Sequence, residues 1–191
     1  MLAIAHAGCL VGIEAHPVEV EVQLGRGLPG FDIVGLPERG VRESRVRVKA
    51  ALHSSGYSLP PRHLVLNLAP GDLRKTGSGF DLAIAVSVLA ACGLVSTDRL
   101  ATTLLAGELS LSGGLRHVPG VLAQLRSARE RGLETAIIPE ANAAEGALID
   151  GIDVHVANEL RDVVEWLCAG GSLRRAGERS VRAGEPGAGP R

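Results

Sequence analysis

The chain has 191 residues, of which 46% are hydrophobic and 21% charged, while only 2% are aromatic. This composition is typical of one folded domain or two very small ones, and it excludes a chain that is disordered throughout. Lys and Arg number 20 against 21 Asp and Glu, so the formal net charge is -1 and no overall positive field attracts polyanions. One Trp, one Tyr and two Phe are too few to stack successive unpaired bases. Any contact with nucleic acid must therefore be local and electrostatic.

Three widely spaced cysteines, Cys9, Cys92 and Cys168, form no Cys-x-x-Cys pair and leave an odd number. This pattern argues against a disulfide framework or a zinc knuckle and favours a reducing, cytoplasmic location. The longest apolar run, residues 82–91, is interrupted by Ser87 and is shorter than the roughly 20 residues that a bilayer-spanning helix needs. We therefore expect no membrane span. The histidines show no pair at helical spacing, so we expect no metal site either.

The first part of the chain is predicted to form an antiparallel meander. Residues 1–9 lack the basic start of a lipoprotein signal and predict a first strand instead. Residues 18–24 alternate strictly between apolar and polar, which is the period of a strand with one wet face. Gly and Pro at 25–30 then predict a turn, and residues 31–34 predict a short buried strand.

An amphipathic helix is predicted over residues 38–53, after Pro37 and before the Ser-Ser-Gly sequence at 54–56. The side chains expected on its buried side are Val41, Ser44, Val48, Ala51 and Leu52. The opposite side carries Arg39, Arg42, Arg45, Arg47 and Lys49 against Glu38 and Glu43. This local excess of positive charge is either a solvated helix face with Glu–Arg pairs, which we favour, or a basic stripe for phosphates.

The later part of the chain alternates between strands and helices. Residues 64–68 predict a buried strand, and residues 81–93 are so uniformly apolar that they predict a helix buried on most of its circumference. The further elements expected are a strand at 104–106, a Gly-rich hairpin or loop at 107–119, a helix at 121–131, a strand at 136–138, a short helix at 139–146, a strand at 153–156, and a helix at 159–167 capped by Asn158. This order is typical of an α/β (α+β) domain with helices packed on a mixed sheet. From residue 170 the composition shifts to Gly, Ala, Pro and Arg, as in a linker or tail.

The loop at residues 71–79, Gly-Asp-Leu-Arg-Lys-Thr-Gly-Ser-Gly, invites comparison with a phosphate-binding P-loop. The order of residues is wrong for one, because Lys75 and Thr76 precede the glycines, and no acidic strand of Walker B type follows. The loop could still hold an anion through free amides at the mouth of the next helix. The candidate anion-binding residues are Lys75, Gly77, Ser78 and Gly79. Ser78 with Lys75, or with Lys49, would alternatively form the Ser–Lys pair of a hydrolase.

Three segments resemble the amino-terminal domain of the bacterial magnesium-chelatase-like AAA+ proteins, the ComM/YifB group. They are residues 27–37, Gly-Leu-Pro-Gly-Phe-Asp-Ile-Val-Gly-Leu-Pro, residues 43–51, Glu-Ser-Arg-Val-Arg-Val-Lys-Ala-Ala, and residues 67–82, which begin Asn-Leu-Ala-Pro-Gly-Asp. Residues 107–120 and 133–139 are also similar to the proteolytic domain of Lon peptidases. The resemblance implies a Lon-protease-domain-like fold, shared with domain 2 of ribosomal protein S5.

The similarity to Lon also implies where a catalytic Ser–Lys dyad would stand. Matching the flanking glycines places Gly79 at the position of the nucleophile and Leu122 at the position of the base. Both members of the dyad are then missing, and Ser78 is one residue out of register. We therefore expect a pseudo-peptidase, with a residual Ser–Lys hydrolase or a small anion- or nucleotide-binding module as the alternatives.

The ComM/YifB group continues into an AAA+ motor with Walker motifs and is associated with DNA branch migration in competence. The resemblance therefore implies a Lon-like, ChlI-type accessory domain over residues 1–168 and a linker or tail over 169–191. ATP and Mg would belong to the motor, this chain would need no cofactor, and a hexamer would form only with the motor. Weak electrostatic contacts with DNA are expected from Arg42, Arg45 and Lys49, at positions i, i+3 and i+7 of one helix, and from Arg74.

Overall fold

The alternating residues near the amino terminus form a long β-hairpin, as the sequence predicts. The computed structural model describes residues 1–178, and in it β1 (Leu2–Val11) pairs antiparallel with β2 (Glu14–Leu24). Gly12 in the turn has a φ of 63°, a conformation that glycine adopts without steric cost. The valines of β2 are buried and the glutamates between them are only partly covered. The hairpin therefore has one core face and one wet face.

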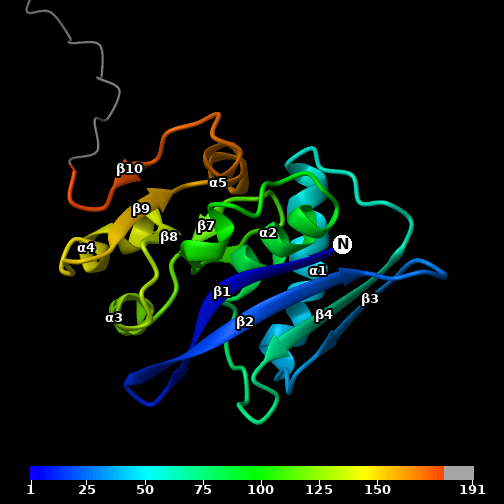
Figure 1. Ribbon diagram of the computed structural model, residues 1–191, viewed down its shortest axis with the longest axis horizontal. Helices are drawn as coiled ribbons and strands as arrows, with labels where there is room; N and C mark the ends of the chain where they lie inside the picture. The colour runs from blue at the N-terminus through cyan, green and yellow to red at the C-terminus, as the bar shows by residue number, and fades with distance from the viewer. Residues whose placement is uncertain (179–191) are drawn as a thin grey trace, which may run out of the picture.

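Eight strands form a mixed sheet in the order β10-β9-β8-β5-β1-β2-β4-β3 (Figure 1). The other strands of this sheet are β3 (Gly30–Val34), β4 (His63–Ala69), β5 (Thr103–Leu105), β8 (Thr135–Pro139), β9 (Asp153–Ala157) and β10 (Arg174–Arg175). β1 is antiparallel to β2 and parallel to β5. The meander half and the half made of alternating strands and helices are thus joined through β1 in one sheet. A separate small hairpin consists of β6 (Glu108–Leu109) and β7 (Leu115–Arg116).

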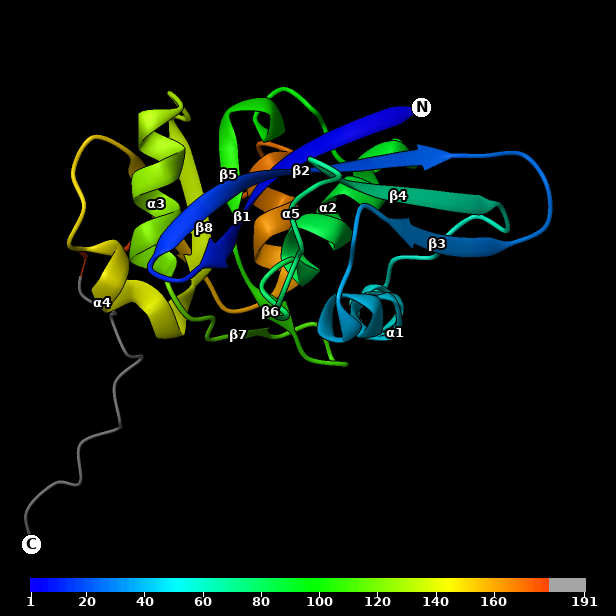
Figure 2. The ribbon, with the colours of Figure 1, turned by 90° about the horizontal axis from the view of Figure 1, so that it is seen from below.

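Helices cover both faces of this sheet and divide its core in two. They are α1 (Arg39–Ser54), α2 (Asp81–Ala91), α3 (Val121–Glu130), α4 (Ala143–Gly146) and α5 (Leu160–Leu167), with 3-10 turns at Leu100–Thr102 and Glu140–Asn142. One cluster of buried side chains joins α1, α2 and α5 to one face of the sheet, and a second cluster joins α3 to the other face (Figure 2). Every residue of α2 is buried, because α2 lies between the sheet and α1. The predicted all-apolar buried helix is confirmed.

The predicted buried side of the first helix is also confirmed. The buried residues of α1 are the expected Val41, Ser44, Val48, Ala51 and Leu52. These positions recur at the spacing of one helix face, and a helix with such a face is stabilised chiefly by packing against its neighbours.

Two predictions, one about the burial of a strand and one about a helix cap, are wrong. The strand predicted over residues 31–34 is not buried as a whole, because β3 is the last strand of the sheet and Asp32 and Val34 face solvent. The residue capping α5 is Glu159 rather than Asn158, since the Asp162 carboxylate accepts hydrogen bonds from both of their backbone N–H groups. A carboxylate in the first turn satisfies amides that the helix itself leaves free.

The sheet extends beyond the expected domain boundary at residue 168. β10 pairs antiparallel with β9, and Ala176 is buried in the core on the α3 face. The expected linker therefore begins no earlier than this strand, and its residues 179–191 lie outside the described part. Within residues 1–178 no helix has the length and apolar character that crossing a bilayer requires.

Candidate functional site

The loop at residues 70–79 is tied to the junction between β3 and α1. The N–H of Lys75 donates to the carbonyl of Leu36 at 3.2 Å, and the N–H of Glu38 donates to the carbonyl of Lys75 at 3.0 Å. This short bridge holds the loop beside the start of α1 and leads it into α2. The candidate anion-binding residues and the candidate basic stripe therefore lie at neighbouring places in the fold.

Lys75 is buried, although it belongs to a polar loop. Its side chain has no exposed surface, and its ammonium group donates to the carbonyl of Pro70. Burial lowers the pKa of Lys75 below its ordinary value, against smaller opposing effects of Cys9 and Asp72. The aliphatic part of Lys75 thus fills core space, and the amine hydrogen-bonds inward instead of standing at the mouth of α2.

Ser78 does not have the partner that a Ser–Lys hydrolase needs. Its hydroxyl donates to a carboxylate oxygen of Glu108 on β6, and Glu108 also lies 3.7 Å from Arg116. Within residues 1–178 no hydrogen bond joins Ser78 to Lys75 or to Lys49. The structure therefore places a carboxylate beside Ser78, where an anion or a neutral lysine was considered.

A buried ion pair beside this loop escaped sequence analysis. Nε of Arg47 lies 2.7 Å and Nη2 lies 3.0 Å from the two carboxylate oxygens of Asp81, whose side chain is fully buried. Asp81 also accepts the backbone N–H of Leu109 at 3.1 Å, and Arg47 donates to Ser44. The hydrogen bond to Asp81 raises the pKa of Arg47 above its ordinary value. The one signal in the sequence was a single Asp at the start of an otherwise apolar helix.

Gly79 and Leu122, the two positions matched to the Lon dyad, carry no reactive group. Gly79 comes two residues before α2, and a Cβ built there would lie 3.8 Å from Val118, an ordinary contact that leaves room for a side chain. Leu122 is in the first turn of α3 and 40% exposed. Neither a nucleophile nor a base occupies the two positions.

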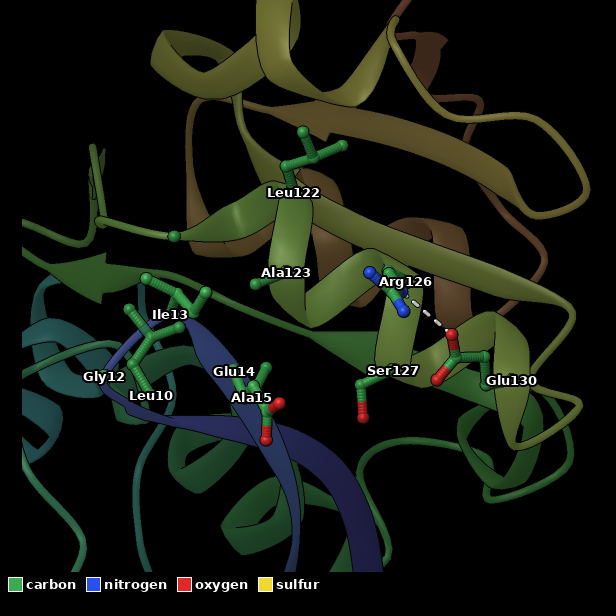
Figure 3. Close-up of a pocket in the computed structure, with 11 residues that line it drawn as sticks. Leu10, Gly12, Ile13, Glu14, Ala15, Leu122, Ala123, Arg126, Ser127 and Glu130 are labelled. Atoms are coloured by element: carbon green, nitrogen blue, oxygen red, sulfur yellow. Dashed lines mark hydrogen bonds and ion pairs between the residues drawn. The ribbon is translucent and has the colours of Figure 1, made fainter.

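Leu122 lines a groove between the tip of the β1–β2 hairpin and α3. The groove has a volume of about 720 Å³, and its walls include Leu10 and Ile13 on the hairpin and Ala123 on the helix (Figure 3). Arg126 in the same wall is paired with Glu130 at 2.9 Å. Glu14 and Ser127 also line the groove, so its walls combine aliphatic contact surface with a few polar groups.

The basic stripe of Arg42, Arg45 and Lys49 lies on the exposed side of α1, as the sequence predicts. Two of its members also contact β3. Nη1 of Arg45 donates to the carbonyl of Phe31 at 3.4 Å, and Nζ of Lys49 lies 5.6 Å from the centre of the Phe31 ring. No ion pair to any of the three is found among residues 1–178.

Two of the five basic residues on this helix are not available to a ligand. Arg47 is committed to Asp81, and Arg39 pairs with Glu43 at 2.9 Å. Arg74, the fourth candidate for DNA contact, is 80% exposed and lies 3.8 Å from Glu38, the residue just before α1. The structure therefore brings Arg74 to the start of the same helix.

The cysteines and the possible metal ligands among residues 1–178 form no binding cluster. The three cysteines are free thiols. Within the described residues no three His, Cys, Asp or Glu side chains gather where they could hold a metal ion.

Comparison with known proteins places the chain in a family. The profile of the family described as subunit ChlI of Mg-chelatase matches residues 20–142. The chain belongs to this family. YifB of Salmonella typhimurium is 41% identical over 174 residues, which cover 91% of this chain and 34% of YifB. The competence protein ComM of Haemophilus influenzae is 39% identical over 166 residues, covering 87% of this chain and 32% of ComM.

A more distant similarity connects this ChlI-family chain to proteases. Lon protease 2 of Bacillus subtilis is 24% identical over 163 residues, covering 78% of this chain and 29% of the protease. The mixed α/β structure agrees with the Lon-like, S5-like fold that the sequence predicts, and that prediction is confirmed. The chain spans about a third of the length of its YifB and ComM relatives.

Proposed function

We propose that this domain is a non-catalytic accessory part of a magnesium-chelatase-like AAA+ ATPase, in which it contributes contacts and assembly surfaces. The observation that carries the proposal is the pair Gly79 and Leu122, which gives the fold of a peptidase neither a nucleophile nor a base. ATP and Mg would be bound by the motor in the remainder of the longer protein. That motor is the domain's first partner, and a hexamer would form through it.

Two alternatives have less support in the geometry. A residual hydrolase built on Ser78 would need a neutral amine within hydrogen-bonding reach, and Lys75 donates to Pro70 instead. An anion- or nucleotide-binding module at Gly77, Ser78 and Gly79 would have to tolerate the Glu108 carboxylate bonded to Ser78. Negative charge next to the site opposes anion binding.

We further propose that the domain takes part in DNA handling, with branch migration in competence as the process. Similarity to a protein named competence protein supports this step. The contacts would be made by Arg42, Arg45 and Lys49, which share one exposed side of α1, with Arg74 beside them. Three or four phosphate contacts give weak binding. The logarithm of the binding constant should fall linearly with the logarithm of the salt concentration, with a slope of roughly -2 to -4. A ring of several copies would strengthen the binding by avidity.

The test is DNA binding at low salt by the wild type and by the triple variant Arg42→Glu, Arg45→Glu, Lys49→Glu. Single-stranded and branched DNA are both used, and fluorescence anisotropy gives the affinity. We expect the triple variant to lose binding to both forms and the wild type to show little base preference, because no row of aromatic side chains accompanies the stripe. Arg126→Glu, Arg129→Glu and Arg131→Glu together make the matched control, since they reverse equal charge on and directly after α3, away from the stripe. Equal affinity of the wild type and the stripe variant would contradict the proposal.

A further inference from the structure

β3 leaves one edge of the sheet open. It is the last strand in the sheet order and pairs only with β4 (Figure 2). In an extended strand the N–H and C=O of one residue point to the same side, and successive residues alternate. The carbonyl of Phe31 accepts a hydrogen bond from the Arg45 side chain instead of from β4. The backbone N–H and C=O of Phe31 therefore point away from β4. Ile33 is two residues further along the strand, so its backbone N–H and C=O point away from β4 as well.

β3 is short and carries one charged side chain, Asp32, which lies 3.0 Å from His63, but the outward backbone groups of this edge have little protection. Natural sheets guard their edges with proline, with charged side chains or with a covering element. Phe31 and Ile33, whose backbone groups point outward, are neither proline nor charged. Among residues 1–178, the one side chain that hydrogen-bonds to this edge is Arg45, whose guanidinium lies at a long 3.4 Å from the carbonyl of Phe31. An incoming strand could displace it.

The surroundings of the edge show what kind of strand would fit. On the α1 side stand the three cations of the basic stripe, with Val46 among them at 62% exposed. On the opposite face of the sheet stand Val34 and Val65, both exposed, on the neighbouring strands β3 and β4, together with Asp32, whose carboxylate lies 3.0 Å from His63. Because the side chains of a strand alternate between the two faces of a sheet, a segment that fits this edge must alternate between two kinds of residue. It carries acidic residues toward α1 and apolar residues toward the two valines.

We propose that β3 binds an extended, acidic segment of a partner protein, which adds to the sheet as a further strand. The backbone of Phe31 and Ile33 would supply hydrogen bonds, and the stripe of Arg42, Arg45 and Lys49 would supply the charge complementarity that selects acidic over basic segments. This inference goes beyond the proposed contact with DNA. Since both ligands would use the same cations, they would exclude one another.

The test uses a blocked synthetic peptide of alternating valine and glutamate, with a valine–lysine peptide of equal length as the control. Binding is followed by amide hydrogen exchange measured by NMR. We expect the acidic peptide to slow exchange at Phe31 and Ile33 by about tenfold or more, because each amide gains a hydrogen bond. Asp32 serves as the internal control, since its N–H points toward β4 and is already bonded in the ladder. The lysine peptide should change none of the three.

Two variants separate this proposal from binding of DNA. Ile33→Pro removes an outward N–H while leaving the β3–β4 ladder intact, because proline is tolerated on the free side of an edge strand. It should abolish peptide binding and leave DNA binding unchanged. The triple charge reversal of the stripe should weaken both. Amide exchange of the free Ile33→Pro chain establishes that β4 is still protected.

Three results would overturn the proposal. They are peptide binding that survives Ile33→Pro, binding without slower exchange at Phe31 and Ile33, and no binding of the acidic peptide by a chain that does bind DNA. The last of these would leave the contact with DNA standing. Loss of DNA binding alone, with the peptide still protecting the two amides, would remove the DNA proposal and retain this one.

Discussion

Single residues at the entry to α2 show how far a sequence pattern can mislead about a charged side chain. Lys75 lies in a stretch of Gly, Asp and Thr that has the composition of a solvated loop, yet its side chain is buried and donates to Pro70. The reason is the bridge to Leu36 and Glu38, which draws the loop onto the core. That bridge joins residues distant in sequence, so local composition holds no trace of it.

The burial of Lys75 predicts a specific pH dependence of stability. Its pKa in the folded chain lies below the ordinary 10.5, so between these two values the unfolded chain binds more protons than the folded chain. The free energy of unfolding of the wild type therefore increases as pH rises through this window, because Lys75 loses its proton in the folded chain. At neutral pH Lys75 is charged, and its burial lowers the free energy of unfolding by the full amount. Lys75→Met carries no such titration.

Urea unfolding of the wild type and Lys75→Met, from neutral pH to pH 10.5, measures the effect. Every other titrating group is common to both chains, so the difference between their free energies of unfolding isolates Lys75. We expect this difference to move in favour of the wild type as pH rises. A difference that stays constant with pH would show that Lys75 titrates as a solvated lysine.

The Arg47–Asp81 pair gives a second prediction at the residue scale. Asp81→Ala should lower the free energy of unfolding by about 3–5 kcal/mol, because it leaves the Arg47 guanidinium partly buried without its partner. It also leaves the N–H of Leu109 without an acceptor. Glu43→Ala, which breaks the exposed pair with Arg39, is the control and should cost little. Equal, small losses in both variants, measured by urea unfolding, would show that the buried pair is not a structural tie.

At the scale of elements, the sequence predicts helices and strands wherever one element has a clear period. The buried side of α1 and the alternation of β2 follow from spacing alone. Spacing could not predict which strand lies at the edge of the sheet. For this reason β3 was expected to be buried, although it is an edge strand. The same limit applies to β10, because Arg174–Arg175 has no apolar pattern, and its place is set by contacts with distant residues: pairing with β9 and ion pairs to Glu140 and Asp153.

The packing of α3 on the hairpin makes a prediction for one glycine. A Cβ built on Gly8 of β1 would lie 2.9 Å from the Cγ of Gln124 in α3, so the helix approaches the strand as closely as it does because no side chain intervenes. Gly8→Val should destabilise the fold by about 1–3 kcal/mol through this overpacking. It should also speed amide exchange in α3 more than in α2.

Gly71→Val is the matched control for Gly8→Val. A Cβ at Gly71 meets nothing within 4 Å, so this change should stay within about 0.5 kcal/mol of the wild type. If the two variants unfold at the same urea concentration, close contact with α3 is not what requires glycine at position 8.

On the scale of the whole molecule, the chain has the Lon-like fold that the sequence predicts. The sequence was sufficient for the fold class, because antiparallel alternation early and alternating elements later leave few arrangements of a mixed sheet. The match of Gly79 and Leu122 to the two dyad positions rests on the resemblance to Lon and stays a prediction. The sequence could not place the side chains around them, and so the Glu108 carboxylate beside Ser78 came only from the structure.

Peptide cleavage by this domain tests the non-catalytic proposal most directly. The measurement is turnover of a fluorogenic peptide by a clean preparation of the wild type and of Ser78→Ala, over a range of pH. We predict that Ser78→Ala changes nothing, because the lysine base of a Ser–Lys pair is not in reach of the hydroxyl: Lys75 donates to Pro70 instead. Turnover by the wild type that disappears in Ser78→Ala, with both chains equally folded, would contradict the proposal and make this domain an enzyme.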